Sequence, residues 1–126
     1  CLVGSEMCIR DSIYESLALK YRYAIEQLSA VTGRAFTTLH VLGGGTKDRL
    51  LCQMTADCCG LTVKAGPVEA TALGNIMIQL KALGLLDSIT QGRRLIAETE
   101  VIKTYTPSTQ NYAEWNAAYD RFEPLL

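Results

Sequence analysis

The stretch that decides the fold is Leu39–Asp57, LHVLGGGTKDRLLCQMTAD. The stretch Phe36–Leu42 predicts a strand, in which Leu39, Val41 and Leu42 indicate burial on both faces, as in the centre of a parallel sheet. Three consecutive glycines, Gly43–Gly45, end this strand abruptly. The helical spacing of apolar residues then predicts a helix over Lys47–Cys59. A strand, a glycine turn and a helix in this order are typical of α/β folds.

Helices and strands alternate on both sides of this stretch. The sequence predicts helices over 13–31, 47–59, 69–83, 88–97 and 108–122, and strands over 36–42, 61–65 and 101–105. Gly66-Pro67 is a turn signal between the second strand and the third helix. The last helix carries a stripe of aromatic residues that predicts a docking face: Tyr112, Trp115, Tyr119 and Phe122. This alternation predicts an α/β fold with a mainly parallel sheet flanked by helices.

Composition sets the class of protein. The chain has 126 residues, of which 48% are hydrophobic, so it suits one compact domain or part of a larger one. The net charge of −1 gives no electrostatic attraction to nucleic acid or to an acidic membrane surface. No apolar run approaches the roughly 20 residues that span a bilayer. We therefore expect neither nucleic acid nor a membrane as a partner.

The five cysteines form no C-x-x-C pair, and the single histidine, His40, lies far from them in the sequence. A zinc site therefore lacks ligands at a recognisable spacing. His40 is expected to be a packed strand residue. We expect reduced, structural thiols, which are typical of a cytoplasmic protein.

Residues 1–12, CLVGSEMCIRDS, differ in character from the rest of the chain. They lack the basic leader and continuous apolar stretch of a signal peptide. They resemble the translation of a sequencing adapter, so we expect a non-native leader here. The helical pattern begins at Ile13, and Ser12 with Glu15 is spaced as a capping box for that helix. We therefore expect the functional residues to lie among residues 13–126.

The glycine turn is the candidate site. Glycine has no Cβ and accepts positive φ, so a ligand can approach the backbone closely. In parallel α/β sheets, ligands bind beyond the carboxyl ends of the strands, where Gly43–Gly45 fall. The turn matches neither the Walker A motif nor G-x-G-x-x-G, and Lys47 has the wrong spacing for a P-loop lysine. Local chemistry leaves two interpretations, a nucleotide- or phosphate-binding turn and a tight connection without a ligand.

The stretch Leu39–Asp57 resembles the adenosine motif of the FGGY family of carbohydrate kinases, which have the actin-like ATPase fold. The continuation Val63–Gly84, VKAGPVEATALGNIMIQLKALG, is similar to the same family and is more specific than the glycines. The similarity extends from Ile13 to Phe122. It implies that residues 13–126 are the C-terminal, incomplete part of an actin-like, ribonuclease H-like nucleotide-binding domain.

The resemblance also implies a site and an activity. Gly44, with Gly43 and Gly45 beside it, is expected to lie against the adenosine side of ATP. Asp48 occupies the first turn of the next helix, where relatives often carry an asparagine that contacts the nucleotide. The resemblance further implies transfer of the γ-phosphate of ATP, with Mg²⁺, to the 1-hydroxyl of L-rhamnulose in the cytoplasm. The catalytic base, the phosphate loops and the Mg²⁺ ligands are expected upstream, so no catalytic residue is assigned here.

Two alternatives to an L-rhamnulose kinase remain open. The parent protein could be another ketose kinase of the same family, or a catalytically inactive nucleotide-binding or interaction module derived from it. A sugar-lobe aspartate and phosphate loops in the upstream sequence distinguish an enzyme from such a module. In either case we expect this chain alone to be inactive.

Overall fold

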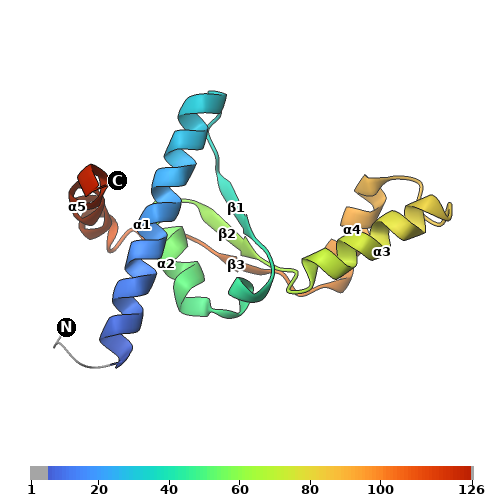
Figure 1. Ribbon diagram of the computed structural model, residues 1–126, viewed down its shortest axis with the longest axis horizontal. Helices are drawn as coiled ribbons and strands as arrows, with labels where there is room; N and C mark the ends of the chain where they lie inside the picture. Colours follow the sequence, from blue (N-terminus) through green and yellow to red (C-terminus); the bar gives the residue numbers. More distant parts are fainter. Residues whose placement is uncertain (1–5, 126) are drawn as a thin grey trace.

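The computed structural model of the chain describes residues 6–125. Its elements in order are α1 (Glu6–Thr32), β1 (Thr38–Val41), η1 (Gly44–Lys47), α2 (Arg49–Cys59), β2 (Thr62–Ala65), α3 (Ala70–Ala82), α4 (Ile89–Thr99), β3 (Lys103–Tyr105), α5 (Tyr112–Phe122) and η2 (Glu123–Leu125). Figure 1 shows helices packed beside a small sheet, with α3 and α4 projecting away from it. The predicted α/β fold is confirmed.

The sheet has the order β1-β2-β3. β1 and β2 are parallel, as expected, whereas β3 runs antiparallel to β2. β1 was expected in the centre of a sheet with both faces buried, and this expectation is wrong for the described chain. β1 is an edge strand, because among residues 6–125 only β2 pairs with it. His40 is correspondingly exposed rather than packed.

One face of the sheet is covered by α2. Cys52 and Ala56 of α2 are buried against Val63 and Ala65 of β2, with Leu39, Val41 and Tyr105 packed around them. The opposite face is polar. The strand register aligns His40, Lys64 and Thr104 across the three strands, and all three side chains are exposed. The sheet thus has one apolar face and one solvated face.

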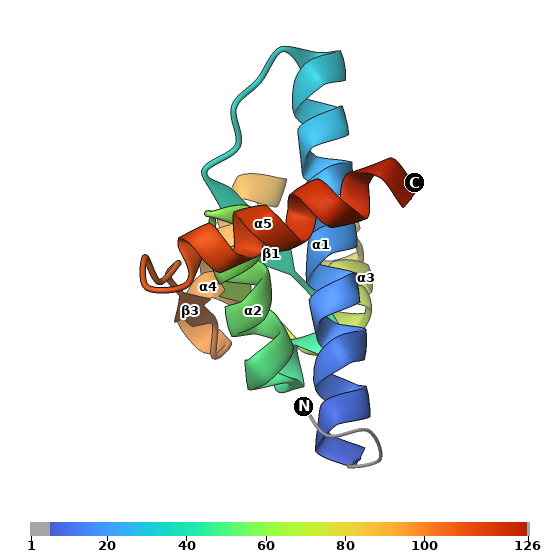
Figure 2. The same cartoon turned by 90° about the vertical axis from the view of Figure 1, so that its left-hand side faces the viewer.

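A second core lies where α1, α2 and α5 meet. Ala18 and Leu19 of α1 are buried there with Cys58 and Tyr119. Figure 2 shows α5 crossing over α1 and α2. The predicted docking face of the last helix is therefore confirmed for Tyr119 and for the partly buried Trp115 and Phe122, whereas Tyr112 is half exposed.

Polar contacts of Arg22 hold α5 in place. Its Nε donates to Glu26 Oε1 at 2.9 Å, and its Nη1 donates to Asn116 Oδ1 at 2.8 Å. The guanidinium also lies 4.2 Å from the centre of the Tyr119 ring. Tyr119 in turn donates from its hydroxyl to Glu26 Oε2 at 2.6 Å. Burial, reinforced by this bond to Glu26, raises the pKa of Tyr119 well above its usual range.

Helices α3 and α4 form a hairpin that packs chiefly on itself. Ser88 is the N-cap of α4, where its side chain accepts a hydrogen bond from the Gln91 backbone N–H at 3.1 Å. The two helices lie in close contact at Gly92 of α4, where a Cβ would collide with the Met77 side chain. Because α3 projects away from the sheet, none of its residues is buried.

The N-terminal region differs from the expectation. α1 begins at Glu6 rather than at Ile13, so the helix is continuous through Ser12 and no capping box forms there. The backbone carbonyl of Ser12 instead accepts a hydrogen bond from Ser16 Oγ at 2.8 Å. Residues 1–5 of the predicted leader lie outside the described residues.

The thiols follow the expectation only in part. Cys52, Cys58 and Cys59 are free. Cys8 is disulfide-bonded, contrary to the expectation of reduced thiols throughout, and Cys1 lies outside the described residues. Both of these cysteines belong to the predicted leader, so the expectation holds for the cysteines of residues 13–126. Within the described part of the chain, no helix combines the length and the apolar character that crossing a membrane requires.

Candidate functional site

The glycine turn lies where the carboxyl ends of the two parallel strands meet. The Gly66 N–H donates to the Val41 carbonyl at 2.9 Å, which extends the β1–β2 ladder beyond the strands. The Gly43 N–H then donates to the Pro67 carbonyl at 3.2 Å. These two bonds hold the glycine turn beside the Gly66-Pro67 turn. The candidate site is therefore built at the edge of the sheet where α/β proteins bind ligands.

Within the turn, the carbonyl groups are used internally. Gly43 has φ of 79°, which favours glycine, and its carbonyl accepts from Thr46 N at 3.1 Å and Thr46 Oγ1 at 2.7 Å. The Gly45 carbonyl accepts from the Asp48 N–H at 3.3 Å. These bonds fix the backbone of the turn through its oxygen atoms.

The N–H groups of Gly44 and Gly45 are different. They lie at the start of the short η1 helix, where no preceding helical carbonyl can accept them. In the described part of the chain neither N–H donates to a backbone or side-chain acceptor. A Cβ added at Gly44 would meet no atom within 4 Å, so space is open beside it. The turn therefore presents two backbone donors and an uncovered surface.

Asp48 has a defined structural role. Its Oδ1 accepts from the Leu51 backbone N–H at 3.0 Å, which makes it the N-cap of α2. Its Oδ2 accepts a short hydrogen bond from the Tyr14 hydroxyl of α1. The bond from Tyr14 and the bond from the Leu51 N–H hold the pKa of the Asp48 carboxyl below its usual value. The predicted contact between Asp48 and a nucleotide stays a prediction.

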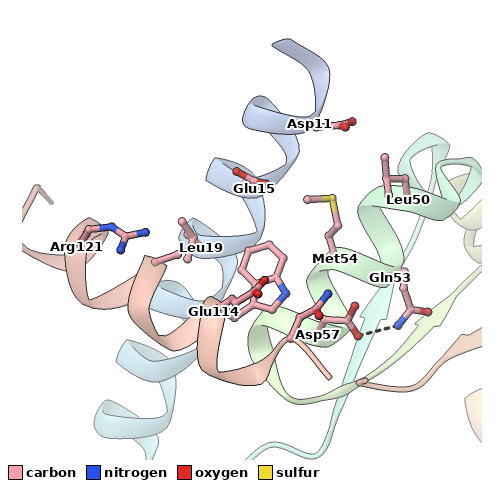
Figure 3. Close-up of a pocket in the computed structure, with 12 residues that line it drawn as sticks. Asp11, Glu15, Leu19, Leu50, Gln53, Met54, Asp57, Glu114 and Arg121 are labelled. Atoms are coloured by element: carbon pink, nitrogen blue, oxygen red, sulfur yellow. Dashed lines mark hydrogen bonds between the residues drawn. The ribbon is translucent and has the colours of Figure 1, made fainter. Parts of the chain in front are cut away.

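A separate pocket of about 500 Å³ lies between α1, α2 and α5 (Figure 3). Its lining residues are Asp11, Glu15, Leu19, Leu50, Gln53, Met54, Asp57, Asn111, Glu114, Trp115, Ala118 and Arg121. Four of these side chains are carboxylates, and only Arg121 is a cation. Such a lining repels the phosphates of a nucleotide. The pocket is therefore not the candidate nucleotide site.

One of these carboxylates, that of Asp57, already accepts hydrogen bonds within the chain. Asp57 Oδ1 accepts from Gln53 Nε2 at 2.8 Å and from the Ser108 N–H at 2.7 Å. Gln53 Nε2 also donates to the Thr106 carbonyl at 2.9 Å. Gln53 and Asp57 thus tie α2 to the chain that follows β3, which is a structural role.

Metal ligands are not gathered in the described part of the chain. Among residues 6–125, no three or more His, Cys, Asp or Glu side chains are grouped where they could hold a metal ion. The expectation that Mg²⁺ ligands lie upstream stays a prediction.

Sequence reasoning missed two partners of the site. The Pro67 carbonyl fixes Gly43, and Tyr14 fixes Asp48, although 34 residues separate that second pair. Gly66 also has a role beyond its turn, since a Cβ there would lie 2.8 Å from the Val101 carbonyl oxygen. The dipeptide Gly66-Pro67 was a usable signal for a turn, but nothing local indicates what the turn touches.

Comparisons with known proteins give a family. The model of the C-terminal domain of the FGGY family of carbohydrate kinases matches residues 9–83. A rhamnulokinase of Bacteroides thetaiotaomicron is 48% identical over 111 residues, which are 88% of this chain and 22% of that protein. A rhamnulokinase of Enterobacter sp. strain 638 is 42% identical over 110 residues, which are 86% of this chain and 22% of that protein. The chain thus spans about a fifth of these relatives.

A solved structure shares the fold. Xylulose kinase from Rhodospirillum rubrum superposes with a TM-score of 0.71 and 21% sequence identity. The superposition covers 99% of this chain and 25% of that kinase. At this identity the likeness shows the fold alone, so it supports the actin-like ATPase architecture and not a substrate.

Proposed function

Because this chain belongs to the FGGY family of carbohydrate kinases, we propose that it forms the adenosine side of the ATP site in a longer sugar kinase. The observation that carries the proposal is the glycine turn at the ends of β1 and β2. Among residues 6–125 the backbone N–H groups of Gly44 and Gly45 have no acceptor, and Gly44 leaves room for a ligand against the backbone. Backbone donors at such a turn suit the ribose and α-phosphate region of a nucleotide.

We propose L-rhamnulose as the sugar, phosphorylated at its 1-hydroxyl in the cytoplasm. The support is the identity of 48% and 42% to two rhamnulokinases. The likeness to xylulose kinase is 21% in identity and carries no substrate information. The rhamnulose assignment is therefore favoured over another ketose kinase.

The proposal assigns the nucleotide contacts to this chain and the catalytic groups to the remaining part of the kinase. Bound MgATP supplies the phosphoryl group, and its transfer needs a base for the sugar hydroxyl and ligands for the metal. This chain's residues position the nucleotide at Gly43–Gly45, while Asp48 holds the start of α2 behind the turn. We assign the base, the phosphate loops and the metal ligands to the upstream part of the kinase. That residues 1–12 are a non-native leader stays a prediction, which the genomic reading frame decides.

The test is Gly44→Val in the full-length protein. The added Cβ meets no atom within 4 Å, so we expect an unchanged melting temperature without nucleotide. It also occupies the surface proposed for the nucleotide, so we expect KM for ATP to rise at least about tenfold, equivalent to roughly 1.4 kcal/mol. KM for L-rhamnulose should stay the same. Steady-state kinetics with each substrate varied in turn measures both constants.

The matched control is Ala30→Val, which adds a β-branched side chain at an exposed position of α1. We expect both KM values to stay unchanged in this variant. An unchanged KM for ATP in Gly44→Val would contradict the nucleotide assignment. Activity on a different ketose but not on L-rhamnulose would contradict only the choice of sugar.

A further inference from the structure

Two hydrogen bonds tie the glycine turn to distant parts of the described chain. Next to the sheet, the Gly43 N–H donates to the Pro67 carbonyl at 3.2 Å. Next to the helices, the Tyr14 hydroxyl of α1 donates to Oδ2 of Asp48, which lies between η1 and α2. This second bond joins residues 34 positions apart and comes from one side-chain hydroxyl. Removing that hydroxyl therefore isolates its contribution to the turn.

Asp48 connects Tyr14 both to the turn and to α2. Its Oδ1 accepts from the Leu51 N–H at 3.0 Å, and its own N–H donates to the Gly45 carbonyl at 3.3 Å. The Gly45 carbonyl also accepts a weak hydrogen bond from the Cys52 thiol at 3.8 Å. The Asp48 carboxylate, the start of α2 and the Gly45 backbone thus form one hydrogen-bonded unit. A shift of the carboxylate is therefore transmitted to the turn.

The packing of α1 fixes the position of Tyr14. α1 lies along α2 (Figure 2). Ala18, one helical turn after Tyr14 on the same face of α1, is fully buried in the core that includes Cys58 of α2. Tyr14 itself is partly buried. The hydroxyl that reaches Asp48 is thus carried by a helix that the core holds in place.

The bond from Tyr14 also restrains a negative charge. Together with the bond from the Leu51 N–H, it lowers the pKa of the Asp48 carboxyl, which is therefore ionised at neutral pH. Without the hydroxyl, one oxygen of this carboxylate loses its donor and is no longer held against α1. Gly44 and Gly45 are exposed nearby in the sequence, and a mobile carboxylate beside them repels the phosphates of a nucleotide.

The contacts of Tyr14 therefore bear on ATP as well as on stability. We propose that Tyr14 is a positioning residue of the nucleotide site, which acts through Asp48 to hold the glycine turn and to keep the carboxylate directed at α1. The inference rests on the proposed function, because the surface that Tyr14 positions is the one assigned to ATP. It adds to that site a residue of α1 that no pattern around Gly43–Gly45 indicates.

Tyr14→Phe in the full-length protein tests the role, since it removes the hydroxyl and keeps the ring. We expect KM for ATP to rise about threefold to tenfold, with kcat and KM for L-rhamnulose unchanged. A purely structural role would lower the melting temperature and leave all three constants unchanged below it. Tyr21→Phe is the matched control, because the Tyr21 hydroxyl of the same helix makes no hydrogen bond among residues 6–125. It should change none of the three constants.

A double-mutant cycle shows whether Tyr14 acts through Asp48. Asp48→Ser retains a capping hydroxyl, but it removes the charge and the oxygen that accepts from Tyr14. In the Asp48→Ser background, we expect Tyr14→Phe to change KM for ATP by less than about twofold. The same fold-change in both backgrounds would mean that Tyr14 acts independently of Asp48, and it would overturn the proposal.

Hydrogen exchange in the full-length protein without nucleotide tests the anchor independently of ATP. We expect Tyr14→Phe to speed the exchange of the Asp48 and Leu51 amides at least about fivefold, because both donate within the unit that Tyr14 holds. The Gly66 amide donates to the Val41 carbonyl and should exchange at an unchanged rate. Unchanged exchange of the Asp48 and Leu51 amides would show that Tyr14 does not hold the turn, which overturns the proposal.

The kinetic results separate this proposal from the proposed function. A raised KM for ATP in Gly44→Val together with an unchanged one in Tyr14→Phe would overturn the role of Tyr14 and leave the nucleotide assignment intact. An unchanged KM for ATP in both variants would contradict the nucleotide assignment, and the role of Tyr14 would fall with it. A raised KM in both variants, with the loss of the Tyr14→Phe effect in the Asp48→Ser background, is the expected result.

Discussion

Asp48 joins two helices through one carboxylate. One oxygen caps α2 through the Leu51 N–H, and the other accepts from Tyr14 of α1. Both hydrogen bonds favour the ionised form, which is why the pKa of Asp48 is lowered in the folded chain. A lowered folded pKa contributes stability above the unfolded pKa of about 3.9, and this contribution is lost as the pH falls through the folded pKa.

We expect Asp48→Ala to lower the free energy of unfolding by about 1–2 kcal/mol at pH 7, because it removes a helix cap and a hydrogen-bond acceptor. The difference from the unmodified chain should shrink as the pH falls below about 4. Urea unfolding at a series of pH values measures it.

Asp48→Ser is the matched control, because serine also caps helices but carries no charge. It should recover part of the loss at pH 7 and show a weaker pH dependence than the unmodified chain. A loss in Asp48→Ala that is the same at pH 7 and at pH 3 would show that the charge of Asp48 contributes nothing.

At the scale of elements, the α3–α4 hairpin depends on one close approach. A Cβ at Gly92 would collide with Met77 and lie 3.4 Å from Leu86 Cδ1, whereas a Cβ at Gly74 would meet no atom within 4 Å. Both glycines lie in helix interiors, where alanine is intrinsically favoured by about 1 kcal/mol. Substitution by alanine therefore creates a steric clash at Gly92 and none at Gly74.

We expect Gly74→Ala to stabilise the hairpin by up to about 1 kcal/mol. Gly92→Ala should lose that gain and destabilise the hairpin by roughly 1 kcal/mol, because Met77 must leave its position. Hydrogen exchange of the α3 and α4 amides measures the local stability of both variants. A gain of equal size in the two variants would mean that Met77 moves aside without cost.

At the scale of the molecule, the proposed function gives the described chain one side of a nucleotide site. It presents the glycine turn, but among residues 6–125 no metal-binding group of side chains accompanies it. Phosphoryl transfer needs a base and bound Mg²⁺ in addition to nucleotide contacts. Under the proposed function, the turn positions the nucleotide, and the base and the metal ligands come from elsewhere in the longer protein.

We expect residues 13–126 alone to show no L-rhamnulose-dependent turnover of ATP, at a detection limit about 10⁴-fold below the full-length protein. A coupled assay for ADP measures this, with the full-length protein as the positive control. Turnover that depends on L-rhamnulose, with a KM for ATP that rises in Gly44→Val, would contradict the expected location of the catalytic groups.

The sequence alone determined the local course of the chain. The helices predicted to end at residues 31, 59 and 83 end at Thr32, Cys59 and Ala82, and a glycine with positive φ follows each of them within two residues, namely Gly33, Gly60 and Gly84. The turn at Gly43–Gly45, the strand after Gly60 and the aromatic side of α5 follow equally from residue type and spacing. These features depend on neighbours within one or two turns of helix, so a pattern of a few residues is enough to predict them.

Only the tertiary structure decided which surfaces are covered. The apolar residues of β1 predict burial on both faces, yet β1 is an edge strand, because burial depends on whether another element supplies a partner. Tyr14 reaches Asp48, and Arg22 reaches Asn116 across 94 residues, through the packing of α1 on α2 and α5. Such contacts join segments that no local pattern relates. Periodicity therefore predicts that a face is apolar, and the arrangement of elements in space decides what covers it.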